Sequence, residues 1–217
     1  MNASHRLILV LVLAACDIRD RGPVDSATLR HGPAGPALEI TILGDERDPR
    51  MPAAREAIEH WNAEFKRLDR RLRFDTVGIR PDSIPDTVVR AAQNEAVIGG
   101  GPATSRLLSN LSATPGDVVI ILTQTDLISF SVPWRRGSKG VVAVRRGDIW
   151  PLTLPNTARN VIAHEIGHVL GLSHNTDSTT LMCGRPASCR PAAFTSESAR
   201  FFPLTSADEQ RIVARWP

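Results

Sequence analysis

One short stretch of the chain holds the residue types that metal chemistry requires. It reads HEIGHVLGLSH over residues 164–174. Histidines four residues apart lie on one face of an α-helix, so His164 and His168 can point a ring nitrogen at the same ion. Gly171 permits a left-handed turn that would return His174 as a third ligand. Three neutral imidazoles with an open fourth position are typical of a catalytic Zn²⁺ site, because a structural site is closed by four protein ligands.

Glu165 follows the first of these histidines and is offset around the helix. Its carboxylate can therefore reach a metal-bound water without binding the ion, which is the place of a general base in hydrolysis. We expect one catalytic Zn²⁺, although the same ligands accept other divalent ions. The alternative, a buried helix with satisfied core histidines, is disfavoured because three of the chain's six histidines fall within this stretch.

The stretch resembles the extended zinc-binding motif of the metzincin metallopeptidases. Thr179-Thr180-Leu181-Met182 follows it and puts Met182 where metzincins have the Met-turn, a tight turn beneath the metal. Astacins and serralysins carry a tyrosine shortly after this methionine. Here position 184 is glycine and the chain has no tyrosine, so those two subfamilies are disfavoured. The resemblance is closest to the matrixins, because the strand Leu38–Leu43, the helix bearing Trp61 and Leu72-Arg73-Phe74 resemble the start of a matrixin catalytic domain.

The resemblance implies a zinc endopeptidase that acts on proteins or peptides. It implies an α+β, metzincin-like (zincin) domain with a twisted mixed β-sheet, an active-site helix, a Met-turn and a C-terminal helix. It further implies that residues 147–149 form a strand before the zinc helix. A strand at 140–146 would offer its backbone edge to an extended substrate, and the loop 183–203 would flank the substrate pocket.

Hydrophobic periodicity predicts the elements that must position these residues. Apolar spacings of three and four predict a helix at 53–68, and a continuous apolar run predicts a buried strand at 117–124. Residues 125–138 are expected to form a surface loop, and 103–112 a short helix or an irregular excursion. The predicted order gives a single mixed domain over 37–217. The other predicted elements are strands at 37–44, 71–79 and 139–146 and helices at 86–98, 156–172 and 205–215.

The N-terminus carries the features of an export signal. The apolar run Leu7–Ala15 is too short to span a bilayer, but it fits a secretory signal. It ends Leu13-Ala14-Ala15-Cys16, which resembles a bacterial lipobox, in which the cysteine receives a lipid. The resemblance implies a lipoprotein signal peptide at 1–15 and a protein exported to the periplasm or cell exterior, anchored to the membrane through Cys16. A plain secretory signal with a chance cysteine is the alternative.

Proline, glycine and charged residues dominate residues 16–36, which we expect to form a flexible tether. With Cys16 lipidated, Cys183 and Cys189 remain, and in an oxidising compartment they could form a disulfide. Two free thiols are the alternative.

The overall composition limits the partners. Hydrophobic residues make up 42% of the 217-residue chain, which is ordinary for a globular protein. The 26 basic and 23 acidic residues are spread along the chain, so we expect no nucleic-acid partner. We also expect a monomer.

Two other functions fit the same site. A catalytically silent, zinc-stabilised binding lipoprotein would bind the metal without hydrolysis, but metal binding alone does not require Glu165. Hydrolysis of cell-wall peptides would use the same residues on a different substrate.

Overall fold

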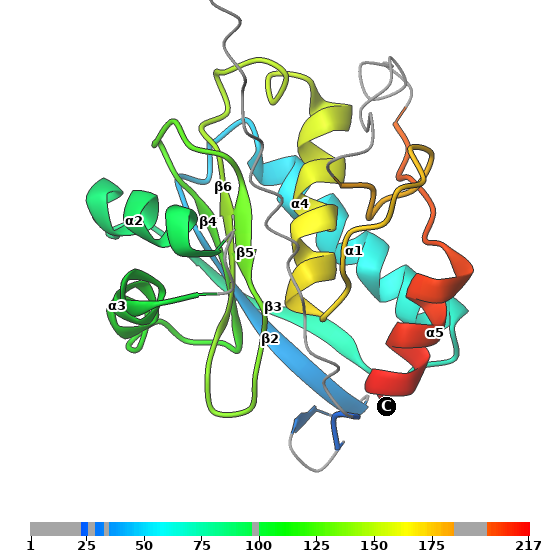
Figure 1. Ribbon diagram of the computed structural model, residues 1–217. Helices are drawn as coiled ribbons and strands as arrows, with labels where there is room; N and C mark the ends of the chain where they lie inside the picture. The colour runs from blue at the N-terminus through cyan, green and yellow to red at the C-terminus, as the bar shows by residue number, and fades with distance from the viewer. Residues whose placement is uncertain (1–22, 26–28, 33–34, 97–99, 185–198) are drawn as a thin grey trace, which may run out of the picture.

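The computed structural model describes residues 23–25, 29–32, 35–96, 100–184 and 199–217. Within them the chain forms an α+β fold with six strands in one sheet and five helices (Figure 1). The strands are β1 Arg30–Gly32, β2 Gly35–Leu43, β3 Arg73–Arg80, β4 Val118–Leu122, β5 Phe130–Val132 and β6 Gly140–Val144. The helices are α1 Met51–Arg67, α2 Asp86–Ala96, α3 Pro102–Asn110, α4 Pro155–Val169 and α5 Ser206–Arg215.

The sheet is mixed. Its order is β1-β2-β4-β6-β5, and β3 also pairs with β2. Strands β2, β3, β4 and β6 run parallel, whereas β1 and β5 pair antiparallel with their neighbours. All five residues of β4 and of β6 are buried, as expected for central strands whose two faces are both covered.

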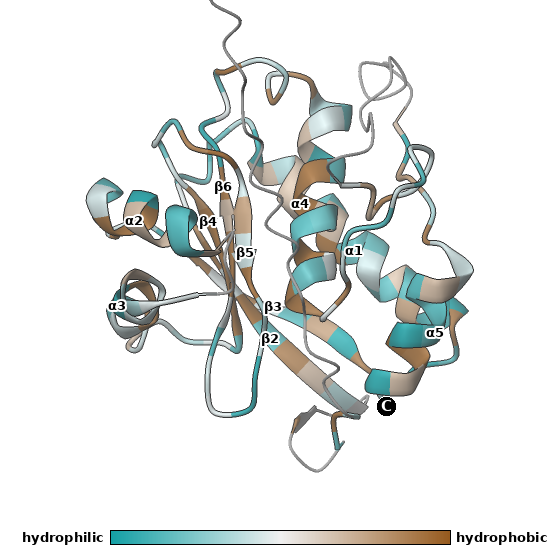
Figure 2. Ribbon diagram, in the orientation of Figure 1, coloured by the Kyte–Doolittle hydropathy of each residue, from teal (hydrophilic) through white to brown (hydrophobic). Residues whose placement is uncertain are grey.

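Helices cover both faces of the sheet. Figure 1 shows α1, α4 and α5 on one side and α2 and α3 on the other. Side chains alternate between the faces along a strand, so Val118, Ile120 and Leu122 join the core beneath α1 and α4. Val119 and Ile121 join a smaller core beneath α2 and α3. Hydrophobic residues accordingly concentrate along the central strands (Figure 2).

Three predictions about the region around β6 are wrong. Residues 130–132 lie in the predicted surface loop, yet they form β5, which pairs with β6. Strand β6 therefore has a neighbour on each side and offers no free edge. Residues 147–149 form a turn rather than a strand. A three-residue strand is too short to show an alternating pattern, so β5 could not be predicted from hydrophobic periodicity.

Part of the predicted tether packs against the domain. Strand β1 pairs with the beginning of β2, and Leu29 is buried. The backbone N–H of Val24 donates to the carbonyl of Arg215 at the end of α5, at 2.6 Å. The structured region therefore begins before residue 37, while the predicted signal peptide and Cys16 lie outside the described residues. None of the helices in the described part of the chain is long and apolar enough to cross a membrane.

Candidate metal centre

Helix α4 positions the first two histidines and Glu165. Proline at its first turn favours helix initiation, because the missing N–H would have no partner there. Its buried residues pack against α1 and the sheet, and Trp61 on α1 donates an indole hydrogen bond to the carbonyl of Ala163 at 2.9 Å. This contact fixes the helix one residue before His164.

The end of α4 turns the chain back toward the site. Gly171 has φ +98°, in the left-handed region that favours glycine. The N–H of Leu172 donates to the carbonyl of Gly167, and the N–H of Gly171 donates to that of His168, at 2.9 and 3.0 Å. These two bonds form a Schellman motif, which ends the helix and lets the next residues approach it again.

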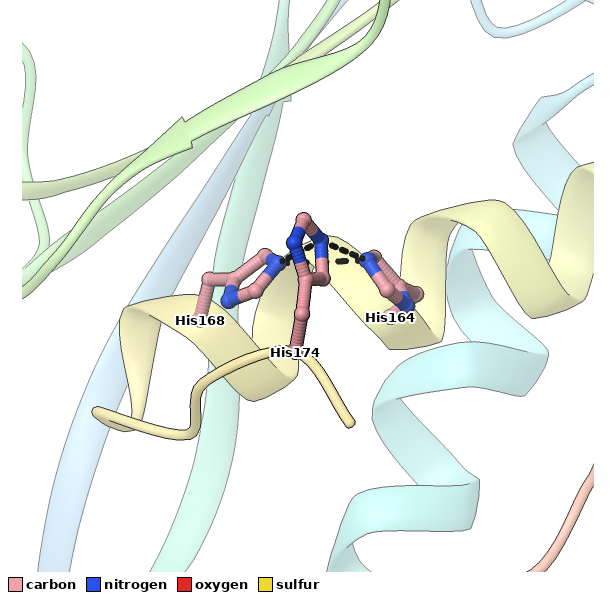
Figure 3. A group of neighbouring side chains, drawn as sticks. All are labelled: His164, His168 and His174. Atoms are coloured by element: carbon pink, nitrogen blue, oxygen red, sulfur yellow. Dashed lines mark hydrogen bonds between the residues drawn. The ribbon is translucent and has the colours of Figure 1, made fainter. Parts of the chain in front are cut away.

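The three predicted histidines converge. Figure 3 shows two imidazoles from α4 and one from the following loop pointing toward one another. The Nε2 atoms of His164 and His168 lie 3.1 Å apart, those of His168 and His174 3.0 Å, and those of His164 and His174 3.2 Å. In a tetrahedral site with Zn–N bonds of about 2.0–2.1 Å, two nitrogens are separated by about 3.3–3.4 Å. The triad is thus close to the spacing that Zn²⁺ requires.

The hydrogen bonds of two rings settle which nitrogen faces the site. Nδ1 of His164 lies 2.7 Å from the carbonyl oxygen of Leu181, and Nδ1 of His168 lies 2.8 Å from that of Leu172. A carbonyl only accepts, so each Nδ1 carries the proton and each Nε2 of a neutral ring presents a lone pair. Two lone pairs that face each other at 3.1 Å repel unless a cation lies between them. The donor set therefore fits a metal ion.

Burial supports the neutral form of these ligands. Burial lowers the pKa of His168, an effect partly opposed by its hydrogen bond to Leu172 and by the charge of Asp208. His164 is buried, His168 is half-buried and His174 is exposed, so the site opens to solvent on the side of His174. A fourth ligand from solvent or substrate would enter there.

Glu165 has a neighbour that sequence reasoning missed. Its side chain is buried, and the hydroxyl of Ser131 donates to its Oε2 at 2.9 Å. Ser131 lies on β5, which we had predicted as loop, and a single serine in a loop carries no signal of its own. The hydrogen bond restricts the orientation of the carboxylate that follows His164 in the helix.

Met182 packs against α4 at Gly167, the residue before His168. It is fully buried, and a Cβ atom built on Gly167 would meet its sulfur at 2.5 Å, so α4 and Met182 are in close contact. The carbonyl of Met182 accepts from the N–H of Asn175, at 2.9 Å. Its role as the methionine of a Met-turn stays a prediction.

The loop that carries His174 is also held by α5. The side-chain amide of Asn175 donates to Oδ2 of Asp208 at 3.1 Å. Asp208 is buried and forms a reciprocal capping box with Thr205 at the start of α5. The final helix thus supports the third ligand.

The predicted cysteine pair lies only partly within the described residues. Cys183 is buried and disulfide-bonded. Cys189 and most of the loop 183–203 lie outside the described residues, as does Cys16. The pairing of Cys183 with Cys189 and the role of this loop at the substrate pocket stay predictions.

Comparison with known proteins supports the class of protein that the histidine motif indicated, the zinc metallopeptidases. Residues 122–199 match the family model named Matrixin, a span that includes β5, β6, α4, the three histidines and Met182. No curated protein sequence matches the chain. Among solved structures, archaemetzincin from Methanopyrus kandleri is similar, with 16% identity over 82% of this chain and 94% of that chain. Its TM-score of 0.47 is too low to support an inference.

The matrixin match, the α+β architecture and the histidine geometry together support a metzincin-type zinc metallopeptidase fold. The predicted fold class is confirmed.

Proposed function

We propose that the chain is a matrixin-like, zinc-dependent endopeptidase that is exported and anchored to a membrane by a lipid on Cys16. The observation that carries the enzymatic part is the convergence of three Nε2 atoms, with the buried Glu165 next to His164 in the sequence of α4. The matrixin match over residues 122–199 supports a protein or peptide as the substrate.

His164, His168 and His174 would hold Zn²⁺, which when bound polarises a carbonyl and lowers the pKa of a water ligand to about 7. Glu165 accepts the proton of the attacking water and delivers it to the leaving amine. Ser131 keeps the carboxylate in one orientation through its hydrogen bond to Oε2. The protein therefore supplies both the base and the group that positions it.

The edge that an extended substrate would use is β5 rather than β6. Strand β5 ends the path of the sheet and pairs only with β6 among the described strands. A peptide added along its outer side would gain main-chain hydrogen bonds. Because β5 also carries Ser131, the bound peptide would pass close to Glu165.

The substitution Glu165→Gln tests the proposal. It keeps the size of the side chain but removes the base, so kcat/KM on unstructured casein should fall by roughly 10²–10⁴-fold, while the zinc content stays that of the wild type. Glu59→Gln is the matched control, because Glu59 is exposed on α1. Cleavage by the E165Q variant at the wild-type rate would contradict the role of Glu165.

Two results with the wild type separate the other functions. Full zinc occupancy without cleavage of any protein or peptide would indicate a silent binding lipoprotein. Cleavage of peptidoglycan peptides but not of casein would indicate a cell-wall substrate.

The anchor needs a separate experiment. The full chain is expressed in a bacterium, and the mature N-terminal peptide is analysed by mass spectrometry. We expect a lipid mass on Cys16 and recovery in the membrane fraction, and we expect Cys16→Ser to lose both. Unmodified Cys16 in a soluble wild-type protein would contradict the anchor and leave the peptidase proposal intact.

A further inference from the structure

The third ligand differs from the other two in how it is held. His164 and His168 lie on a helix that is packed against the core, whereas His174 lies on the loop after it and is exposed. A metal site requires all three rings at once. The contacts of His174 with its neighbours therefore decide whether the site is formed.

Gly184 lies directly against the imidazole of His174. A Cβ atom built on Gly184 would lie 2.1 Å from Cγ of the ring, 2.4 Å from Cδ2 and 2.5 Å from Nδ1. All three atoms belong to the base of the imidazole, since Cγ is its attachment point and Cδ2 and Nδ1 are bonded to Cγ, so a small rotation of the ring tip would not relieve the contacts. Any side chain at position 184 must displace either the ring or the backbone.

The backbone has little freedom to move. The N–H of Gly184 donates to the carbonyl of Asn175 at 3.0 Å, and the N–H of Asn175 donates to the carbonyl of Met182 at 2.9 Å. These bonds form a short parallel bridge between Asn175 and Cys183. Met182 and Cys183 are both buried, so core packing also restrains the segment. The ring is then the group that has to move.

We propose that Gly184 is a positioning residue of the metal site. Its missing side chain lets the segment Met182–Gly184 close against His174 and keep that imidazole within reach of the other two. This inference rests on the proposed metal site but not on peptidase activity.

The test is the Zn²⁺ affinity of the full chain carrying Gly184→Ala, measured by competition with a chelator. Displacing one ligand should weaken Zn²⁺ binding by roughly 10- to 100-fold, the range found when groups that orient ligands are changed. The absorption spectrum of the Co²⁺-loaded protein should also change, because it reports the ligand set and its geometry. Zn²⁺ affinity within twofold of the wild type, with an unchanged Co²⁺ spectrum, would overturn the proposal.

Gly78→Ala is the matched control. Gly78 lies on β3, and a Cβ atom there would meet nothing within 4 Å. Gly78→Ala has the same effect on the unfolded chain as Gly184→Ala. Because its Cβ meets no neighbour, it should leave Zn²⁺ affinity within twofold of the wild type.

A double variant covers the case in which Gly184→Ala weakens the fold. The clash needs the imidazole, so Gly184→Ala should lower the Tm of the metal-free protein by several degrees and have little effect in a His174→Ala background. Equal losses of Tm in both backgrounds would overturn the proposal. Both experiments are free of substrate, so a zinc-bound wild type that cleaves nothing would refute the peptidase without affecting the inference about Gly184.

Discussion

Two polar clusters lie inside this fold, and they satisfy their polar atoms in different ways. At the carboxyl ends of β4 and β6, the guanidinium of Arg50 is 1% exposed and forms a bidentate pair with Asp48, at 2.9 and 2.6 Å. It also donates to four main-chain carbonyls, those of Leu122, Thr123, Val144 and Arg145. At the end of α4, by contrast, three imidazoles turn their Nε2 atoms toward one another.

The difference shows how burial can either stabilise a fold or create a site. Each N–H of the Arg50 guanidinium donates to a protein oxygen, so this cluster needs no hydrogen bond from solvent. In the histidine cluster, the protons are committed to the carbonyls of Leu181 and Leu172, and the lone pairs are left facing each other. The first cluster is closed, and the second is completed only by a cation.

The largest expected change in stability comes from disrupting the Arg50–Asp48 cluster. Arg50→Met removes the cation, leaves the carboxylate of Asp48 buried, and frees several strand-end carbonyls. Removing one partner of a buried ion pair costs about 3–5 kcal/mol. Urea unfolding should therefore show a loss of this size in the free energy of unfolding.

Arg47→Met is the matched control for this measurement. Arg47 also pairs with an aspartate two residues before it, but its side chain is 91% exposed. We expect a change within about 0.5 kcal/mol. Equal losses for the two variants would contradict the role given to the Arg50 cluster.

The next largest change in stability is expected when Zn²⁺ binds the histidine cluster. Zn²⁺ at about 100 times its dissociation constant should raise the free energy of unfolding by about 2.7 kcal/mol, because the ion binds the folded state. A chelator should reverse the rise. His168→Ala should abolish it, whereas His60→Ala, outside the triad, should keep it. A zinc-dependent rise in H168A equal to that of the wild type would place the metal elsewhere.

A smaller effect comes from the hydroxyl that joins β5 to Glu165. Ser131→Val removes the donor, and Ser131→Thr keeps it in a side chain of the same shape as valine. We expect kcat on casein to fall by roughly tenfold in S131V, as for the loss of one hydrogen bond to a charged group. KM and zinc content should stay unchanged, and S131T should stay near the wild type. Equal kcat values for S131V and S131T would show that the hydroxyl has no part.

The same two clusters show what the sequence can and cannot predict. The histidine triad was predictable because its determinants are local: a spacing of four on one helix, and a glycine that ends it. Strands β2, β3, β4 and β6 and helices α1, α2, α4 and α5 were also predicted, because each is long enough to show a hydrophobic period or a continuous apolar run.

The parts that were missed depend on contacts between distant residues. Arg50 lies in a stretch rich in charged residues that is typical of an exposed loop, and it is buried only because two strand ends converge on it. Ser131 reaches Glu165 because β5 pairs with β6, and Gly184 touches His174 because the chain folds back after Met182. A single serine, arginine or glycine has no period that would reveal such a contact.

His60 is a third case, because it lies outside the histidine triad and its buried Nε2 has no hydrogen-bond partner among the described residues. Its ring stacks on Phe201 with centroids 4.1 Å apart. Burial lowers the pKa of His60; the nearby charge of Glu64 opposes this shift and that of Arg67 adds to it. Protonation is therefore less favourable in the folded protein than in the unfolded chain.

The sign of the pH dependence follows from this lowered pKa. When the folded pKa lies below the unfolded value of about 6.5, the unfolded state binds the proton more readily, and stability is lost as the pH falls below that value. His60→Phe keeps an aromatic ring against Phe201 and removes the titration. The Tm of H60F relative to the wild type should be constant above pH 7.5 and rise as the pH falls to 5.5. His168 titrates in both proteins, so the difference in Tm isolates the contribution of His60. A Tm difference that does not change with pH would show that protonation of His60 does not destabilise the fold.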